Sequence, residues 1–261
     1  MTPGSSSSGA PPGETGTDGG VGSKAPGDGG PGDNGSGEAG SDGAPTDMPH
    51  ADLGKGTGTD VVLLGDSWMS NTLQVEGTGG GIAPALIAVA GVPYRNYAVQ
   101  GVMMLTADTF GPAIPTQYPA AKAANPDIKT VVMTGGGNDI IQNPTLQSDC
   151  QMGGAMCKQV LDQIGQALNT LWTQMASDGV QDIVFINYAN NVGSTAQSLR
   201  GDGGVPTPSI CSTGKIRCHE VDTTAAVMSQ IAADGIHPLQ AANQRIAMQV
   251  YALMTQEGMR R

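Results

Sequence analysis

Short apolar segments alternate with longer amphipathic segments along residues 60–261. Five segments have the length and composition of β-strands, and they cover residues 60–64, 94–99, 128–134, 181–188 and 217–223. Three segments have the spacing of apolar residues that favours a helix, namely 80–91, 157–179 and 238–258. Strands that alternate with helices of this length predict a parallel sheet with helices on both faces, which is an α/β fold.

Two stretches between these elements are predicted to be irregular. Residues 110–127 are rich in proline, and residues 189–217 are polar and interrupted by Gly and Pro. In open parallel sheets, ligands bind beyond the carboxyl ends of the strands. Residues that carry chemistry should therefore follow the predicted strands directly.

Composition separates residues 1–59 from the rest of the chain. This segment is dense in Gly, Ser, Pro and Asp and holds no aromatic residue. It cannot bury enough apolar surface to offset the entropy cost of ordering its backbone. We therefore predict a disordered tether over residues 1–59, followed by one domain, 60–261, that is long enough to bury a core.

Charge narrows the classes of partner. The net charge is −11, and residues 1–59 hold 8 acidic and 2 basic residues, so part of the acidity belongs to the tether. The domain has no basic cluster, which argues against nucleic acid and anionic membranes as partners. No segment approaches the roughly 18 consecutive apolar residues of a transmembrane helix. The N-terminal sequence MTPGSSSSG lacks the charged and apolar regions of a signal peptide, so we expect that any export signal has been removed.

The four cysteines form two closely spaced pairs, which are Cys150 with Cys157 and Cys211 with Cys218. Four cysteines allow three disulfide connectivities. Pairing within each close pair is the simplest, because each bond would close a short glycine-containing loop. Reduced thiols and a metal site remain as alternatives, although only His219 lies near a cysteine. Disulfides together with a long tether favour an oxidising location, either secreted or in the cell envelope or periplasm.

Residues 65–67, Gly-Asp-Ser, follow the first predicted strand. Ser67 is a candidate nucleophile, although a serine here can also cap a helix or form an ordinary turn. A serine nucleophile needs a base, usually histidine. His50 lies in the tether and His219 on a predicted strand, which leaves His237, in a loop before the last helix. Asp234, three residues earlier, can orient the ring or can simply cap the helix.

Two further residues follow predicted strands. Asn138, in the sequence GGGND, can donate its side-chain amide to an oxyanion or can be a turn asparagine. Gly101 can present a backbone N–H, although a glycine after a strand is common. Trp68, next to Ser67, is either a wall of the ligand crevice or a packing residue.

These blocks occur in a fixed order: GDS at 65–67, a glycine at 101, GGND at 136–139 and DGIH at 234–237. In this order the chain resembles the SGNH (GDSL-type) hydrolase superfamily over residues 60–258. The sequence G-x-S-x-G, typical of α/β-hydrolases, is absent. The resemblance implies a flavodoxin-like three-layer α/β/α sandwich and no metal or organic cofactor.

The resemblance also implies roles for single residues. Ser67 would attack an acyl carbonyl, His237 would act as the base, and Asp234 would orient His237. The oxyanion hole would comprise the backbone N–H groups of Ser67 and Gly101 and the side-chain amide of Asn138. The block around Gly101 matches the family only loosely.

We therefore expect a serine esterase that hydrolyses carboxylic esters through an acyl-serine intermediate. Few aromatic residues and no long apolar stripe near the motifs favour short acyl chains over a large lipid groove. A carbohydrate O-deacetylase with the same mechanism is an alternative, so the expected partner is a small ester or an O-acylated carbohydrate. A non-catalytic surface module that binds carbohydrate is the alternative from another class.

Overall fold

A computed structural model describes residues 58–72, 75–189 and 205–259, all within one unit, Pro45–Arg261. The predicted tether, 1–59, lies outside the described residues except for its last two positions. Residues 190–204, which belong to the predicted irregular stretch 189–217, lie outside them as well.

The centre of the domain is a five-stranded parallel sheet with the strand order β2-β1-β3-β4-β5. The strands are β1 (Val61–Leu64), β2 (Arg95–Asn96), β3 (Thr130–Met133), β4 (Asp182–Asn187) and β5 (Arg217–Asp222). This order is that of flavodoxin-like sheets, in which the chain reverses its direction of progress between β1 and β3. All five strand positions predicted from the sequence are confirmed, although β2 is shorter than expected.

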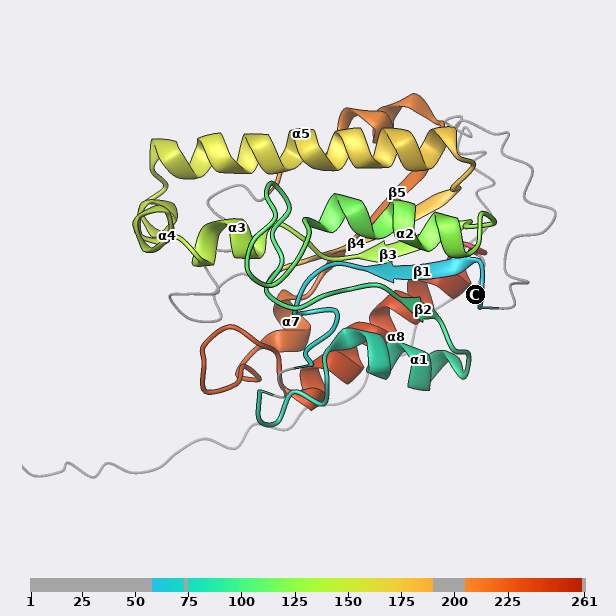
Figure 1. The fold of residues 1–261 in the computed structure, drawn as a ribbon. Helices are drawn as coiled ribbons and strands as arrows, with labels where there is room; N and C mark the ends of the chain where they lie inside the picture. The colour runs from blue at the N-terminus through green and yellow to red at the C-terminus, as the bar shows by residue number, and fades with distance from the viewer. Residues whose placement is uncertain (1–57, 73–74, 190–204, 260–261) are drawn as a thin grey trace, which may run out of the picture. The chain divides into compact units, whose positions relative to one another are not determined.

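Helices cover both faces of the sheet, as Figure 1 shows. One face carries α1 (Ile82–Ala90) and α8 (Gln240–Gln256), and the other carries α2 (Gln117–Ala124) and α5 (Ala155–Ser177). Shorter elements are η2 (Ile114–Thr116), α3 (Gly137–Ile141), α4 (Pro144–Gln151), η3 (Ser209–Thr213) and α7 (Thr224–Val227). None of the described helices is long and apolar enough to cross a membrane. The predicted three-layer α/β/α sandwich is confirmed.

Alternate residues of each central strand point to opposite faces, which gives the domain two cores. In β1, Val62 and Leu64 pack toward α2 and α5, whereas Val61 and Leu63 pack toward α1 and α8. The strand is buried on both sides, and this explains why its sequence is a continuous apolar run rather than an alternation.

The prediction of an irregular stretch at residues 110–127 is wrong, because η2 and α2 lie within it. Pro115 and Pro119 occupy the first turns of these two elements, where no intrahelical N–H bond is lost. The following alanine-rich sequence has high helix propensity. Proline content alone was therefore a misleading sign of irregular structure here.

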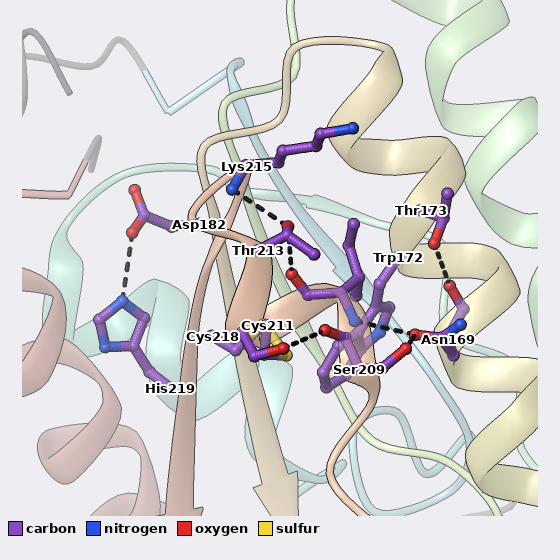
Figure 2. The surroundings of a disulfide bond; sticks show 12 residues. Asn169, Trp172, Thr173, Asp182, Ser209, Cys211, Thr213, Lys215, Cys218 and His219 are labelled. Atoms are coloured by element: carbon purple, nitrogen blue, oxygen red, sulfur yellow. Dashed lines mark hydrogen bonds and ion pairs between the residues drawn. A yellow bond between two sulfur atoms is a disulfide. The ribbon is translucent and has the colours of Figure 1, made fainter. Parts of the chain in front are cut away.

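Both disulfides join the cysteines that are close in sequence, so the simplest predicted pairing is confirmed. Cys150 bonds Cys157 between α4 and α5, and Cys211 bonds Cys218 between η3 and β5. Figure 2 shows the second bond beside α5. The described part of the chain contains no free cysteine.

Candidate active site

The turn after β1 brings Ser67 to the carboxyl edge of the sheet, beside the end of β3. Gly65 has a φ of +133°, and a Cβ there would lie 2.2 Å from Thr134 Oγ1, so only glycine fits. The side chain of Gln117, on α2, binds both backbone groups of Gly65. Its Oε1 accepts from the Gly65 N–H at 2.6 Å, and its Nε2 donates to the Gly65 carbonyl at 2.8 Å. The turn is thus held from the helix layer above it.

Asp66 is buried directly behind the serine. Its Oδ1 accepts from the Thr134 hydroxyl at 3.0 Å and from the Trp68 N–H at 3.1 Å, and its Oδ2 accepts a short hydrogen bond from the Tyr188 hydroxyl. Burial raises the pKa of Asp66, although these hydrogen bonds and the charge of His237 oppose that rise. The carboxyl group of Asp66 is fully used within the protein and serves to position the turn.

Ser67 itself is half-buried and makes no hydrogen bond, through Oγ or its backbone N–H, to any residue that the structure describes. Both groups are therefore available to a ligand. The helix-cap interpretation of this serine predicts a hydroxyl that satisfies a backbone N–H. No such bond is present in the described ranges.

Asp234 and His237 form a hydrogen-bonded pair in the loop before α8. His237 Nδ1 lies 2.5 Å from Asp234 Oδ2. Asp234 Oδ1 accepts from the N–H groups of Ile236 and His237, at 2.9 and 3.0 Å. Partial burial disfavours the charged carboxylate, but these hydrogen bonds outweigh it and lower the pKa of Asp234. An ionised Asp234 holds the proton on Nδ1, which makes Nε2 the basic nitrogen.

The Nε2 atom of His237 is buried and has no hydrogen-bond partner among the described residues. Its loop is anchored by Trp68, whose Nε1 donates to the Ile236 carbonyl at 3.1 Å. Trp68 is buried and meets Tyr188 edge to face at 5.0 Å. Trp68 is therefore a packing residue that connects the serine turn to the histidine loop, and it is not a wall of the cavity.

One cavity of about 220 Å³ brings together Ser67, Gly101, Asn138 and His237. These four residues come from four separate parts of the chain. The remaining residues that line the cavity are Asn71, Val75, Gln100, Phe110, Ile141 and Gln142. Because β1 and β3 flank the point where the chain reverses direction, the cavity lies where open α/β sheets bind their ligands.

Two donors beside Ser67 can face the same point. The Gly101 N–H has no partner among the described residues, and the φ of Gly101 is +76°. Asn138, in the first turn of α3, donates from Nδ2 to the Val102 carbonyl at 2.9 Å. An amide nitrogen carries two N–H groups, so this bond orients Asn138 and leaves the second N–H for another acceptor.

Asp139 ties α3 to the segment that follows Gly101. Its carboxylate oxygens accept from the N–H groups of Met104 and Leu105, at 2.7 and 2.9 Å. Burial raises the pKa of Asp139, and these two bonds counteract the rise. The spacing between Gly101 and Asn138 is thus held by a side chain within the GGND block.

His219 does not take part in this cavity. Its Nε2 lies 3.2 Å from Oδ1 of the buried Asp182, and Figure 2 shows this contact. Asp182 also binds Arg217. His219 lines a different cavity of about 170 Å³ between α5 and β5. His219 therefore lies outside the candidate active site. No group of three or more His, Cys, Asp or Glu residues in the described ranges is arranged to hold a metal ion.

Sequence reasoning missed several residues of the site. Asn71 is buried, lines the cavity and has an Nδ2 atom without a partner among the described residues. Gln142 lies one helical turn after Asn138, a spacing that becomes informative only once α3 is known to be a helix. Tyr188 follows β4 and reaches Asp66 across 122 residues of sequence, so no local pattern indicates the contact.

No family model matches the sequence, and no curated protein matches it. Similar solved structures include a psychrotrophic esterase, EstA, from Pseudoalteromonas sp., at 13% identity and a TM-score of 0.48, over 76% of this chain and 97% of that one. An aryl esterase of M. smegmatis matches at 16% identity and a TM-score of 0.46, over 76% and 97%. A carbohydrate acetylesterase family member from Sinorhizobium meliloti matches at 14% and 0.45, over 75% and 98%.

Proposed function

We propose that this protein is a serine esterase of the SGNH type, which hydrolyses carboxylic esters through an acyl-serine intermediate. One observation carries the proposal. The Asp234–His237 pair leaves an unpartnered Nε2 in the same cavity as an unpartnered serine hydroxyl. A base held by a carboxylate beside a nucleophile is the arrangement that acyl transfer by serine requires.

In the first half of the reaction, Ser67 Oγ attacks the ester carbonyl carbon while His237 Nε2 takes the hydroxyl proton. Asp234 keeps the ring oriented and stabilises the imidazolium that forms. When the tetrahedral intermediate collapses, His237 gives the proton to the leaving alcohol oxygen. The product is an acyl-serine.

The negative charge of the intermediate develops on the former carbonyl oxygen. The N–H groups of Ser67 and Gly101 and the side-chain amide of Asn138 are the proposed donors to it. In the second half of the reaction, His237 takes a proton from water, the resulting attack releases the carboxylic acid, and Ser67 regains its proton.

We propose that the preferred acyl chains are short. The cavity volume of about 220 Å³ lies below the roughly 300–1,000 Å³ of pockets that hold drug-sized ligands. We also propose a secreted or envelope location, which two disulfides support.

The test begins with a fluorophosphonate probe, which reacts with activated serines. The parent protein should be labelled, and Ser67→Ala should not be labelled and should lose on the order of 10⁴–10⁶ in kcat toward p-nitrophenyl acetate. The exposed Ser177, at the end of α5, provides a matched control, because Ser177→Ala should leave labelling and kcat unchanged.

Full activity of Ser67→Ala would contradict the mechanism, and failure of the parent to label would favour a non-catalytic binding module. A series of p-nitrophenyl esters, run beside acetylated xylan, tests the substrate. A preference for dodecanoate or longer chains would contradict the proposal of short acyl groups. A preference for acetylated xylan over the aryl esters would instead indicate a carbohydrate O-deacetylase.

A further inference from the structure

A tight turn at residues 108–111 holds an aromatic side chain at the cavity. Asp108 and Gly111 form an isolated antiparallel bridge, with the Asp108 N–H donating to the Gly111 carbonyl at 3.0 Å. Asp108 Oδ1 accepts from the N–H groups of Phe110 and Gly111, at 2.8 and 3.2 Å. The backbone that carries Phe110 is therefore fixed by three hydrogen bonds within four residues.

The phenyl ring of Phe110 lies directly on Gly101. A Cβ added at Gly101 would lie 2.4 to 2.7 Å from three atoms of that ring. Gln142 connects Gly101 to the turn at residues 108–111. Its Nε2 donates to the Gly101 carbonyl at 2.5 Å and to Asp108 Oδ2 at 3.3 Å. The position of the ring is thus coupled to that of a proposed oxyanion donor.

Phe110 nevertheless remains 49% exposed, although it is one of only two phenylalanines in the chain. A large apolar side chain at a ligand cavity is informative, because its exposed face can be covered by apolar ligand atoms. Val75 and Ile141 line the same cavity and extend this apolar surface.

The reaction geometry indicates which part of the ester meets this surface. The leaving oxygen must come within reach of His237 Nε2 to receive its proton, so the alcohol lies on the histidine side. The acyl substituent then points away from His237. The ring of Phe110 lies on Gly101, and Ile141 lies on α3 three residues after Asn138, so both adjoin the proposed oxyanion donors.

We propose that Phe110 is the residue that determines acyl-chain specificity: its ring closes the acyl part of the cavity beyond Gly101 and limits the length of the acyl group. This inference rests on the proposed function and deepens it. Because the turn is held by its own hydrogen bonds and by Gln142, the ring acts as a fixed wall.

The experiment compares Phe110→Ala and Phe110→Leu with the parent on p-nitrophenyl acetate, butyrate and octanoate. One methylene in an apolar pocket changes kcat/KM by about 10-fold or more, so Phe110→Ala should raise the octanoate-to-acetate ratio by at least about 10-fold. Phe110→Leu keeps an apolar side chain, so its octanoate-to-acetate ratio should lie between those of the parent and Phe110→Ala. This second variant also covers the case in which the alanine variant does not fold. Met152→Ala is the matched control, because Met152 is an exposed apolar residue between α4 and α5.

A second substrate series varies the alcohol at constant acetate, from phenyl to 1-naphthyl. The ratio of these two should stay unchanged in both Phe110 variants, and a shift confined to this series would overturn the acyl assignment. An unchanged octanoate-to-acetate ratio in both variants would overturn it as well. Ser67→Ala is assayed in parallel to separate the two proposals. If Ser67→Ala is inactive, an unchanged octanoate-to-acetate ratio in the Phe110 variants contradicts only the role of Phe110. Full activity of Ser67→Ala contradicts the proposed function itself.

Discussion

The buried contact between Tyr188 and Asp66 permits a prediction with a defined magnitude. In Tyr188→Phe the ring remains, so the edge-to-face contact with Trp68 at 5.0 Å is retained. Only the hydroxyl is lost. That hydroxyl donates to Asp66 Oδ2 and accepts from the Gly137 N–H at 3.2 Å, and all three groups are buried.

The substitution leaves a buried carboxylate oxygen and a buried N–H without this partner. Each such group costs about 1–3 kcal/mol, so the free energy of unfolding should fall by about 2–6 kcal/mol. A typical domain has about 5–15 kcal/mol in total, which makes the loss easy to measure. Asp66 keeps its bonds from Thr134 and Trp68, and this argues for the lower half of the range.

The loss should also depend on pH. The pKa of Asp66 is raised in the folded state, so its contribution to stability is greatest near and below the ordinary value of 3.8 and decreases as the pH rises through the folded-state value. The Tyr188 hydroxyl stabilises the charged form. Its removal should therefore cost more at about pH 8 than at the ordinary value of 3.8, because more of the carboxyl group is ionised at the higher pH.

The assay is urea unfolding, followed by tryptophan fluorescence at both pH values. Tyr97→Phe is the matched control, because the Tyr97 hydroxyl makes no hydrogen bond within the described part of the chain. The control should change stability by less than about 0.5 kcal/mol. A loss in Tyr188→Phe no larger than that of the control, or one equal at the two pH values, would show that the hydroxyl does not support a buried carboxylate.

Three further predictions concern the reaction. Asp234→Asn should lower kcat roughly 10⁴-fold, because an amide does not hold the proton on His237 Nδ1, and a pH–rate profile checks this. Because the pKa of Asp234 is lowered, its orienting effect on His237 is present above about pH 4 and is lost as the pH falls through the folded-state value. A loss of parent activity that tracks Asp234 titration near neutral pH would contradict this. Asn138→Ala should reduce kcat by about 10²–10³ with little change in KM, and equal losses in binding of a ground-state analogue would contradict the oxyanion role. Gly101→Ala places a Cβ 2.4 Å from the Phe110 ring at a φ of +76°, so it should cost about 2 kcal/mol in thermal unfolding and also lower kcat; unchanged stability would contradict the close contact.

The strands and long helices could be predicted because their causes are local. Val61–Leu64 is apolar throughout since both of its faces are buried, and α5 repeats apolar residues at helical intervals, so each pattern is visible within a short window. The candidate residues Ser67, Asn138 and His237 could be chosen because they follow strands or precede a helix. Their roles remain predictions that the experiments above address.

Other features depend on residues that meet only after folding. Gln117 holds Gly65 from 52 positions away, and the short helix that carries it lies in a stretch whose prolines predicted irregular structure. The contacts of Tyr188 with Asp66 and of Phe110 with Gly101 follow from how separate loops gather at the edge of the sheet. The periodicity of apolar residues within a segment indicates which face of that segment is buried. It does not indicate which distant side chain covers that face, because the covering residue depends on strand order and loop packing.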